Sequence, residues 1–178
     1  GLTAVAARRH GERRSSEAAQ VVGEAMGFAL ALGTIVGIIG AMSVDHLFAV
    51  MQTPPEVTAL GRDYLRIYFL GSPLIYGYFA VDAAFRAAGD ARTPFLLLLT
   101  STLCTLVLDP VLILGLGGVP RLGIAGAAIA LVLTRGGAFV IGFVLLTRRG
   151  MLRVRPATMT TVRSIARVGL PTALTGII

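Results

Sequence analysis

The chain has 178 residues, of which 55% are hydrophobic and only 14% are charged, and its mean hydropathy is +0.81. Soluble domains carry about 25% charged residues, so this composition excludes an ordinary soluble protein and indicates a membrane protein. The formal net charge of +7 does not indicate a nucleic-acid partner, because the arginines lie between apolar runs instead of forming one basic face.

Four apolar segments are long enough to cross a bilayer, which takes about 20 helical residues. They are residues 21–44, 59–85, 94–114 and 122–147. In the first segment, Gly33 and Gly37 have the GxxxG spacing that allows helices to pack closely. In the second, Pro73 predicts a kink. We therefore expect an all-α fold, a polytopic transmembrane helix bundle, with loops at 1–20, 45–58, 86–93 and 115–121.

Both ends of the chain predict further membrane segments. The short apolar stretch before Arg8 resembles the end of an earlier helix, and residues 168–178 begin another apolar run after an arginine-rich connection at 148–167. Because the chain opens on Gly1 and stops inside an apolar run, we expect it to be a fragment of a longer protein.

Arginine is distributed unevenly between the two sets of loops. Segments 1–20, 86–93 and 148–167 together hold twelve arginines, whereas 45–66 and 116–121 hold three. The positive-inside rule places the basic loops in the cytoplasm. The helix that starts at Pro94 then climbs outward and, at a rise of 1.5 Å per residue, puts Asp109 about 22 Å above Pro94.

Asp109 is the one carboxylate in the apolar run 93–110, and Pro110 follows it at once. An ionisable residue inside a membrane segment is costly and usually serves a solute or proton path. Pro110 lacks a backbone donor and is expected to loosen the helix beside this carboxylate. We expect the bundle to be organised around this position.

Other intramembrane polar residues are candidates for a supporting role. Asp82 and Arg86 are four residues apart on one helix and can pair, either as a structural ion pair near the interface or in a gating role. Arg135 interrupts the last full span and lies at a depth that permits, without requiring, an interaction with Asp109. The aromatic stretch from Tyr68 to Phe79 either lines a ligand cleft, since aromatic faces suit flat cations, or packs against lipid and neighbouring helices.

Several stretches resemble one known family, the MATE multidrug and toxic compound extrusion transporters. Residues 85–94, FRAAGDARTP, resemble its RGAGDTRTP turn, residues 106–110, LVLDP, resemble its NIVLDP stretch, and residues 123–130, GIAGAAIA, resemble its GVAGAALAT stretch. The basic opening and the closing SIARVGLPTALTGII resemble the loop after its second helix and the start of its seventh. The order and spacing of these motifs make the set specific.

This resemblance implies a twelve-helix transporter with two lobes. Residues 1–147 would be an incomplete N-terminal lobe, from the end of the second helix through the sixth. Residues 148–167 would be the cytoplasmic linker, and 168–178 the truncated start of the C-terminal lobe. In many prokaryotic members, an Asn and an Asp one turn apart on the fifth helix help to bind H⁺ or Na⁺. The Asp maps to Asp109 and the Asn to Thr105, a departure from the pattern.

The sixth-helix partner of that site falls near Leu131, which is also a departure, and Thr134 is the closest hydroxyl. The resemblance implies a secondary antiporter of the cell (inner or plasma) membrane that exports organic, often cationic, compounds in exchange for H⁺ or Na⁺. We expect a multi-pass monomer in the lipid bilayer, with no cofactor and no metal site other than Na⁺ at Asp109. The alternatives are a lipid-linked oligosaccharide flippase of the related superfamily, a membrane-embedded enzyme and a structural membrane subunit.

Overall fold

The computed structural model describes residues 15–153, and every regular element in that range is a helix. The elements are α2 (Ser15–Val50), α3 (Pro55–Leu70), α4 (Ser72–Ala87), α5 (Arg92–Leu114), the 3₁₀ turn η1 (Leu116–Gly118) and α6 (Ile124–Arg148). The expected all-α bundle is therefore confirmed. The expected end of an earlier helix, the linker beyond residue 153 and the helix start at 168 lie outside the described residues.

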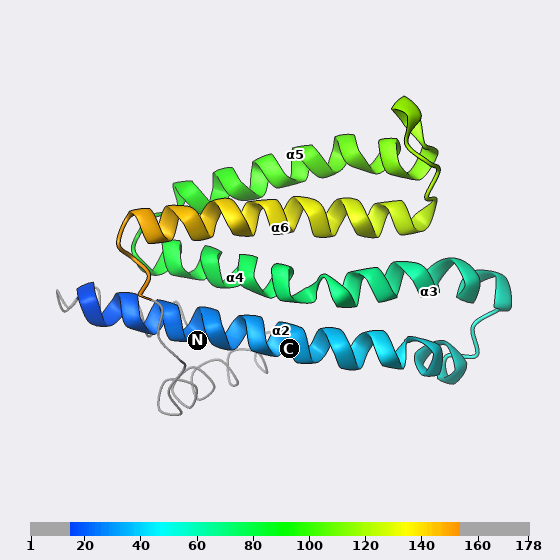
Figure 1. Cartoon of the computed structure of the whole chain (residues 1–178), viewed down its shortest axis with the longest axis horizontal. Coiled ribbons are helices and arrows are strands. Elements are labelled where there is room, and N and C mark those ends of the chain that lie inside the picture. Colours follow the sequence, from blue (N-terminus) through cyan, green and yellow to red (C-terminus); the bar gives the residue numbers. More distant parts are fainter. Residues whose placement is uncertain (1–14, 154–178) are drawn as a thin grey trace, which may run out of the picture.

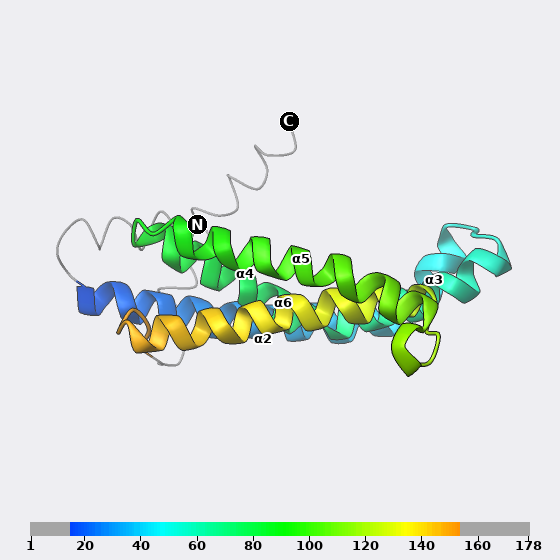
Figure 2. The ribbon, with the colours of Figure 1, turned by 90° about the horizontal axis from the view of Figure 1, so that it is seen from above.

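The helices run side by side along one axis (Figure 1). Helix α2 packs against α3 and α4, and α6 packs against α3, α4 and α5. Figure 2 shows α5 displaced from the layer that contains α2 and α6. Since α4 and α5 touch only lightly, α6 is the element that holds α5 in place.

The second apolar segment forms two helices that are interrupted at Gly71. Pro73 has no N–H with which to bond the carbonyl of Phe69, four residues earlier. The Ser72 hydroxyl takes over, lying 2.7 Å from this carbonyl oxygen and 2.7 Å from that of Gly33 on α2. The kink expected at Pro73 is present as an interruption at Gly71, and the Ser72 hydroxyl makes this joint a contact point with α2.

The main core lies around the half of α4 that leads into α5. Tyr78, Val81 and Phe85 of α4 are buried there, together with residues from α2, α5 and α6 such as Met26, Leu97 and Leu146. The backbone N–H of Arg153 donates to the carbonyl of Ala19 at 3.0 Å, so the segment after α6 closes back onto α2.

Much of the outer surface is apolar, as expected for a membrane protein. Leu103, Leu106 and Val107 on α5 are among many large exposed hydrophobic side chains. Three helical stretches in the described range are long and apolar enough to cross a membrane: Ala18–Val50, Arg92–Leu114 and Ile124–Arg148. The fourth expected span is divided by the break at Gly71 into two helices of 16 residues each.

Helix boundaries differ from the expected ones mainly around α2. We expect 1–20 to be a loop and 45–58 a loop with a short amphipathic start, but α2 is continuous from Ser15 to Val50, so the loop prediction is wrong for 15–20 and 45–50. Near the C-terminal end of α2, Asp45 pairs with Arg62 and Arg66 of α3, with N–O distances of 2.7 Å. A charged residue ends an apolar run without ending a helix, which explains the error.

Candidate functional site

A row of polar side chains follows one face of α5. Ser101, Thr105 and Asp109 are spaced by four residues, and this spacing stacks them on the same side of a helix. Ser101 is buried, whereas Thr105 and Asp109 are half-buried. The Ser101 hydroxyl donates to the Leu98 carbonyl at 2.9 Å, and the Thr105 hydroxyl lies 2.8 Å from the Ser101 carbonyl. Such bonds let hydroxyls sit inside an apolar helix pair.

Thr134 of α6 meets this row. Its hydroxyl oxygen lies 2.7 Å from that of Thr105, and it is also 2.9 Å from the Ala130 carbonyl oxygen. Thr134 is only 8% exposed. The structure thus brings together two of the residues singled out in the sequence, and it forms a hydroxyl pair between α5 and α6.

Asp109 lies one turn beyond Thr105 along α5. Its Oδ1 atom is buried and has no hydrogen-bond partner among the described residues. Leaving a buried charged oxygen without a partner is expensive. Helix α5 continues through Pro110 to Leu114, but the missing proline N–H leaves the Leu106 carbonyl without its usual helical donor. A proton or a small cation at Asp109 would satisfy the orphaned oxygen.

Arg135 reaches away from Asp109. Its Nη1 donates to the Ser101 hydroxyl at 3.2 Å, and its guanidinium carbon lies 5.1 Å from the centre of the Tyr78 ring. Ser101 is eight residues before Asp109, or about 12 Å along the helix axis. Of the two arrangements that the sequence permits for Arg135 and Asp109, the structure has the one without direct contact.

A pocket of about 360 Å³ lies between α4, α5 and α6. Its aromatic walls come from α3 and α4, and three charged side chains also face it. The aromatic and charged residues are Tyr68, Tyr78, Phe79, Asp82, Arg86 and Arg135. The expected pair is present, with Arg86 Nε 2.9 Å from Asp82 Oδ2. The candidates Asp82, Arg86 and Arg135 thus share one cavity, apart from the hydroxyl pair.

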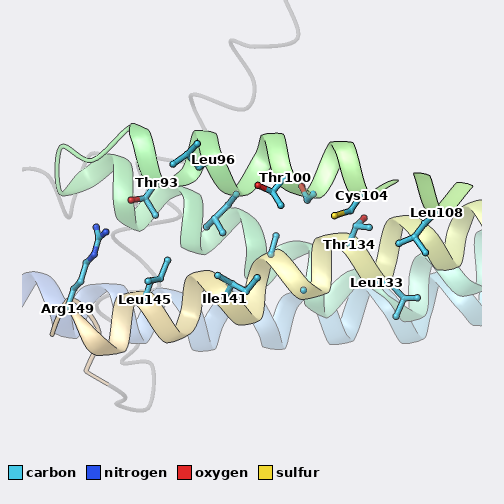
Figure 3. A pocket seen from close by; sticks show the side chains of 14 residues that line it. Thr93, Leu96, Thr100, Cys104, Leu108, Leu133, Thr134, Ile141, Leu145 and Arg149 are labelled. Carbon is cyan, nitrogen blue, oxygen red and sulfur yellow. The ribbon is translucent and has the colours of Figure 1, made fainter. Parts of the chain in front are cut away.

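A second cavity, of about 570 Å³, runs between α5 and α6 (Figure 3). Thr93, Thr100 and Cys104 lie along its α5 side, and Thr134 and Arg149 lie on its α6 side. Most of its remaining lining is aliphatic. It shares no lining residue with the aromatic pocket. Two consecutive residues of α6 therefore line different cavities: Thr134 lines the cavity between α5 and α6, and Arg135 lines the aromatic pocket.

The MatE family model matches residues 1–111, more than half of the chain. The chain belongs to the MatE family. This confirms the resemblance seen in the sequence motifs and, with the apolar helices, makes the chain part of a membrane protein.

Relatives of this MatE chain are named as multidrug resistance proteins or as transporters. It is 34% identical over 149 residues to the probable multidrug resistance protein YoeA of Bacillus subtilis, covering 84% of this chain and 32% of that protein. It is 29% identical over 145 residues to the FAD transporter of Shewanella oneidensis, covering 79% of this chain and 32% of that protein. The MatE chain spans about a third of the length of these curated relatives.

Solved transporters share the fold. The MatE chain matches the inward-facing conformation of a multidrug resistance MATE family transporter of the MOP superfamily, with 27% identity and a TM-score of 0.87. That match covers 97% of this chain and 40% of the other. The outward-facing conformation also gives 27% identity and a TM-score of 0.87, covering 99% and 40%. The fold of this MatE portion is thus equally similar to both conformations.

One polar cluster of this MatE chain went unrecognised in the sequence. Asp90, in the turn between α4 and α5, accepts hydrogen bonds from the Thr93 hydroxyl at 2.6 Å and the Thr93 amide at 2.9 Å. Arg149 Nη1 lies 2.7 Å from Asp90 Oδ2, the same oxygen that accepts from the Thr93 hydroxyl. These bonds, chiefly those from Thr93, lower the pKa of Asp90 from 3.8 to about 2. The spacing of Asp90 and Thr93 is a helix-capping signal that the sequence contains. The contact with Arg149 has no such local signal, because Arg149 is 59 residues away in the sequence.

Proposed function

We propose that the protein containing this chain is a secondary active antiporter that exports small organic compounds, organic cations among them, in exchange for H⁺ or Na⁺. It is a transporter and not an enzyme, and it works as a multi-pass monomer in the cell membrane. Residues 1–147 belong to its N-terminal lobe, 148–167 to the linker on the cytoplasmic side, and 168–178 to the start of the second lobe.

The observation that carries this proposal is the orphaned carboxylate oxygen of Asp109. Membrane segments seldom keep an ionisable group unless it serves transport, and Oδ1 is buried without a partner in the described range. One turn away, the hydroxyl pair of Thr105 and Thr134 adds oxygen atoms that can accept a hydrogen bond from a protonated acid or coordinate a cation.

The coupling mechanism follows from electrostatics. With its charge uncompensated, Asp109 favours a conformation in which water or a cation reaches it, whereas the neutralised group tolerates an occluded site. The bound ion therefore shifts the balance between the outward-facing and inward-facing states. This agrees with the general picture of transporter repeats that rock around a site near the bilayer midplane.

The test uses the full-length protein reconstituted in liposomes, with efflux of the fluorescent cation ethidium driven by a pH gradient without Na⁺ or by a Na⁺ gradient at equal pH. Wild type is compared with Asp109→Asn and with Asp63→Asn, a matched change at an exposed carboxylate of α3. We expect gradient-driven efflux to be lost in Asp109→Asn and kept in Asp63→Asn, and the effective gradient identifies the ion.

Two outcomes would overturn the proposal. Efflux that stays gradient-driven in Asp109→Asn removes this carboxylate from coupling. Translocation of a lipid-linked oligosaccharide, with no gradient-driven export of any small organic compound by the wild type, assigns the protein to the flippases instead.

A further inference from the structure

We propose that the aromatic pocket between α4, α5 and α6 binds an aromatic carboxylate, with Arg135 as the residue that holds the anionic group. This inference rests on the proposed export function and specifies a substrate class for it. It concerns a different part of the bundle from the carboxylate and hydroxyl site on α5.

The charge balance of the pocket is the first step. Its two guanidinium groups and one carboxylate leave one net positive charge. Asp82 is already engaged by Arg86, whose Nε lies 2.9 Å and 3.1 Å from its two carboxylate oxygens. Arg135 has no ion-pair partner in the described range, and its guanidinium interacts with the Ser101 hydroxyl and with Tyr78, neither of which carries a negative charge. An anionic ligand would supply the missing charge.

The aromatic surfaces are the second step. A flat organic cation would be drawn to the exposed π-faces of a pocket like this. Here, however, the protein's own guanidinium already lies over Tyr78, 5.1 Å from the ring centre. Arg135 thus occupies one such face and repels a second cation from it. Tyr68 already stacks on Tyr64, with ring centroids 6.4 Å apart, so the main ring that remains for stacking with an uncharged ring system is Phe79, which is 62% exposed.

Geometry and size are the third step. A guanidinium presents five N–H donors in a planar fork that matches a carboxylate, and the bond to Ser101 uses one of them. The pocket volume of about 360 Å³ lies at the lower end of the range for small-molecule sites. A bicyclic aromatic ring with one carboxylate fits these dimensions and this charge.

The test measures binding of three ligands with the same ring by calorimetry on the full-length protein: 2-naphthoate, neutral 2-naphthamide and cationic 2-naphthylmethylammonium. We expect naphthoate to bind at least tenfold more tightly than the other two. Arg135→Gln lowers naphthoate affinity to that of the amide and leaves amide affinity unchanged, and Arg135→Lys keeps part of the preference. Arg121→Gln, a matched change at an exposed loop arginine, keeps all of it.

Phe79→Ala is a second test of the pocket in case the Arg135 variant does not fold, because this exposed ring contributes little to the core. Phe79→Ala should weaken the binding of naphthoate and the binding of naphthamide to a similar extent. Equal or tighter binding of the ammonium compound, or an unchanged naphthoate affinity in a folded Arg135→Gln, overturns the inference.

The two proposals fail separately. If ethidium export is gradient-driven and depends on Asp109, but naphthoate binds no more tightly than the other two ligands, the antiporter proposal stands and the anion-site proposal fails. Arg135-dependent naphthoate binding without gradient-driven export of naphthoate or ethidium supports the site and removes the antiporter.

Discussion

The hydroxyl oxygens of Thr105 on α5 and Thr134 on α6 lie 2.7 Å apart, within an otherwise largely apolar helix pair. Each hydroxyl also lies within 2.9 Å of the carbonyl four residues earlier on its own helix. Because each hydroxyl has a single proton, one of the pair donates across the interface, and the other accepts that bond and donates its own proton to the carbonyl on its own helix. The pair therefore links the two helices beside Asp109 without using a charge.

A double-mutant cycle measures this link. Thr105→Val and Thr134→Val should each lower the free energy of unfolding, and the double variant should cost less than the sum of the two. Hydrogen bonds between membrane helices average about 0.6 kcal/mol in such cycles and reach about 1.7 kcal/mol, and we expect a coupling energy in that range. Denaturant unfolding of the full-length protein in detergent provides the values. Strictly additive losses would show that the two hydroxyls do not stabilise each other.

Asp109 should lower stability while it serves function. Because its Oδ1 is buried without a partner, Asp109→Asn removes an uncompensated charge and should raise the free energy of unfolding by about 1 kcal/mol, the lower end for an unsatisfied buried group. The measurement is thermal unfolding of the full-length protein in detergent without Na⁺. Asp63→Asn, at an exposed position, should leave the melting temperature unchanged. A less stable Asp109→Asn variant would mean that the carboxylate has a partner in the full-length protein.

Close packing of α2 against the α3–α4 joint depends on Gly37. A Cβ atom at this position would lie 2.6 Å from the Phe69 carbonyl oxygen and 2.9 Å from the Ser72 hydroxyl, so the helices would have to separate. Gly37→Ala should therefore destabilise the protein by about 1–3 kcal/mol. Gly27→Ala on the same helix meets no atom within 4 Å and should not destabilise. Equal melting temperatures for the two variants would contradict the packing role expected from the GxxxG spacing.

The sequence predicts the helices better than it predicts their ends or their contacts. Apolar length identifies the three long helices α2, α5 and α6, and the missing N–H of Pro73 identifies the break in the second apolar segment. Spacing also identifies Asp82 with Arg86 as a pair, because four residues on one helix fix their separation. The contact of a long side chain with a neighbouring helix is harder to predict. From its depth in the sequence of α6, Arg135 could point towards either Asp109 or Ser101 on α5. Only the packed structure decides that it points to Ser101.

Thr105 and Thr134 are candidates because of the family resemblance. The residue pattern alone does not predict that their hydroxyls meet, and the structure shows why. Ser and Thr occur at many membrane positions, and each can satisfy its hydroxyl on its own helix. Their meeting depends on how α5 and α6 are rotated against each other. Arg149 and Asp90 show the same limit, because a contact over 59 residues leaves no local signal in the sequence.

The turn between α4 and α5 should make stability depend on pH in the acidic range. Hydrogen bonds from Thr93 and then from Arg149 hold the pKa of Asp90 at about 2, below its ordinary 3.8. A lowered pKa in the folded state stabilises the protein above the unfolded pKa, and this stabilisation is lost as the pH falls from about 4 to about 2. Asp90→Asn should thus melt at a lower temperature than wild type at pH 5–7, and the gap should close towards pH 2.

Since the Thr93 hydroxyl is the largest cause of the shift in the pKa of Asp90, Thr93→Val should move the acid transition to higher pH more than Arg149→Gln does. Melting temperatures measured against pH for the four proteins decide this, and a larger effect of Arg149→Gln would show that the ion pair, not the capping hydroxyl, controls the turn.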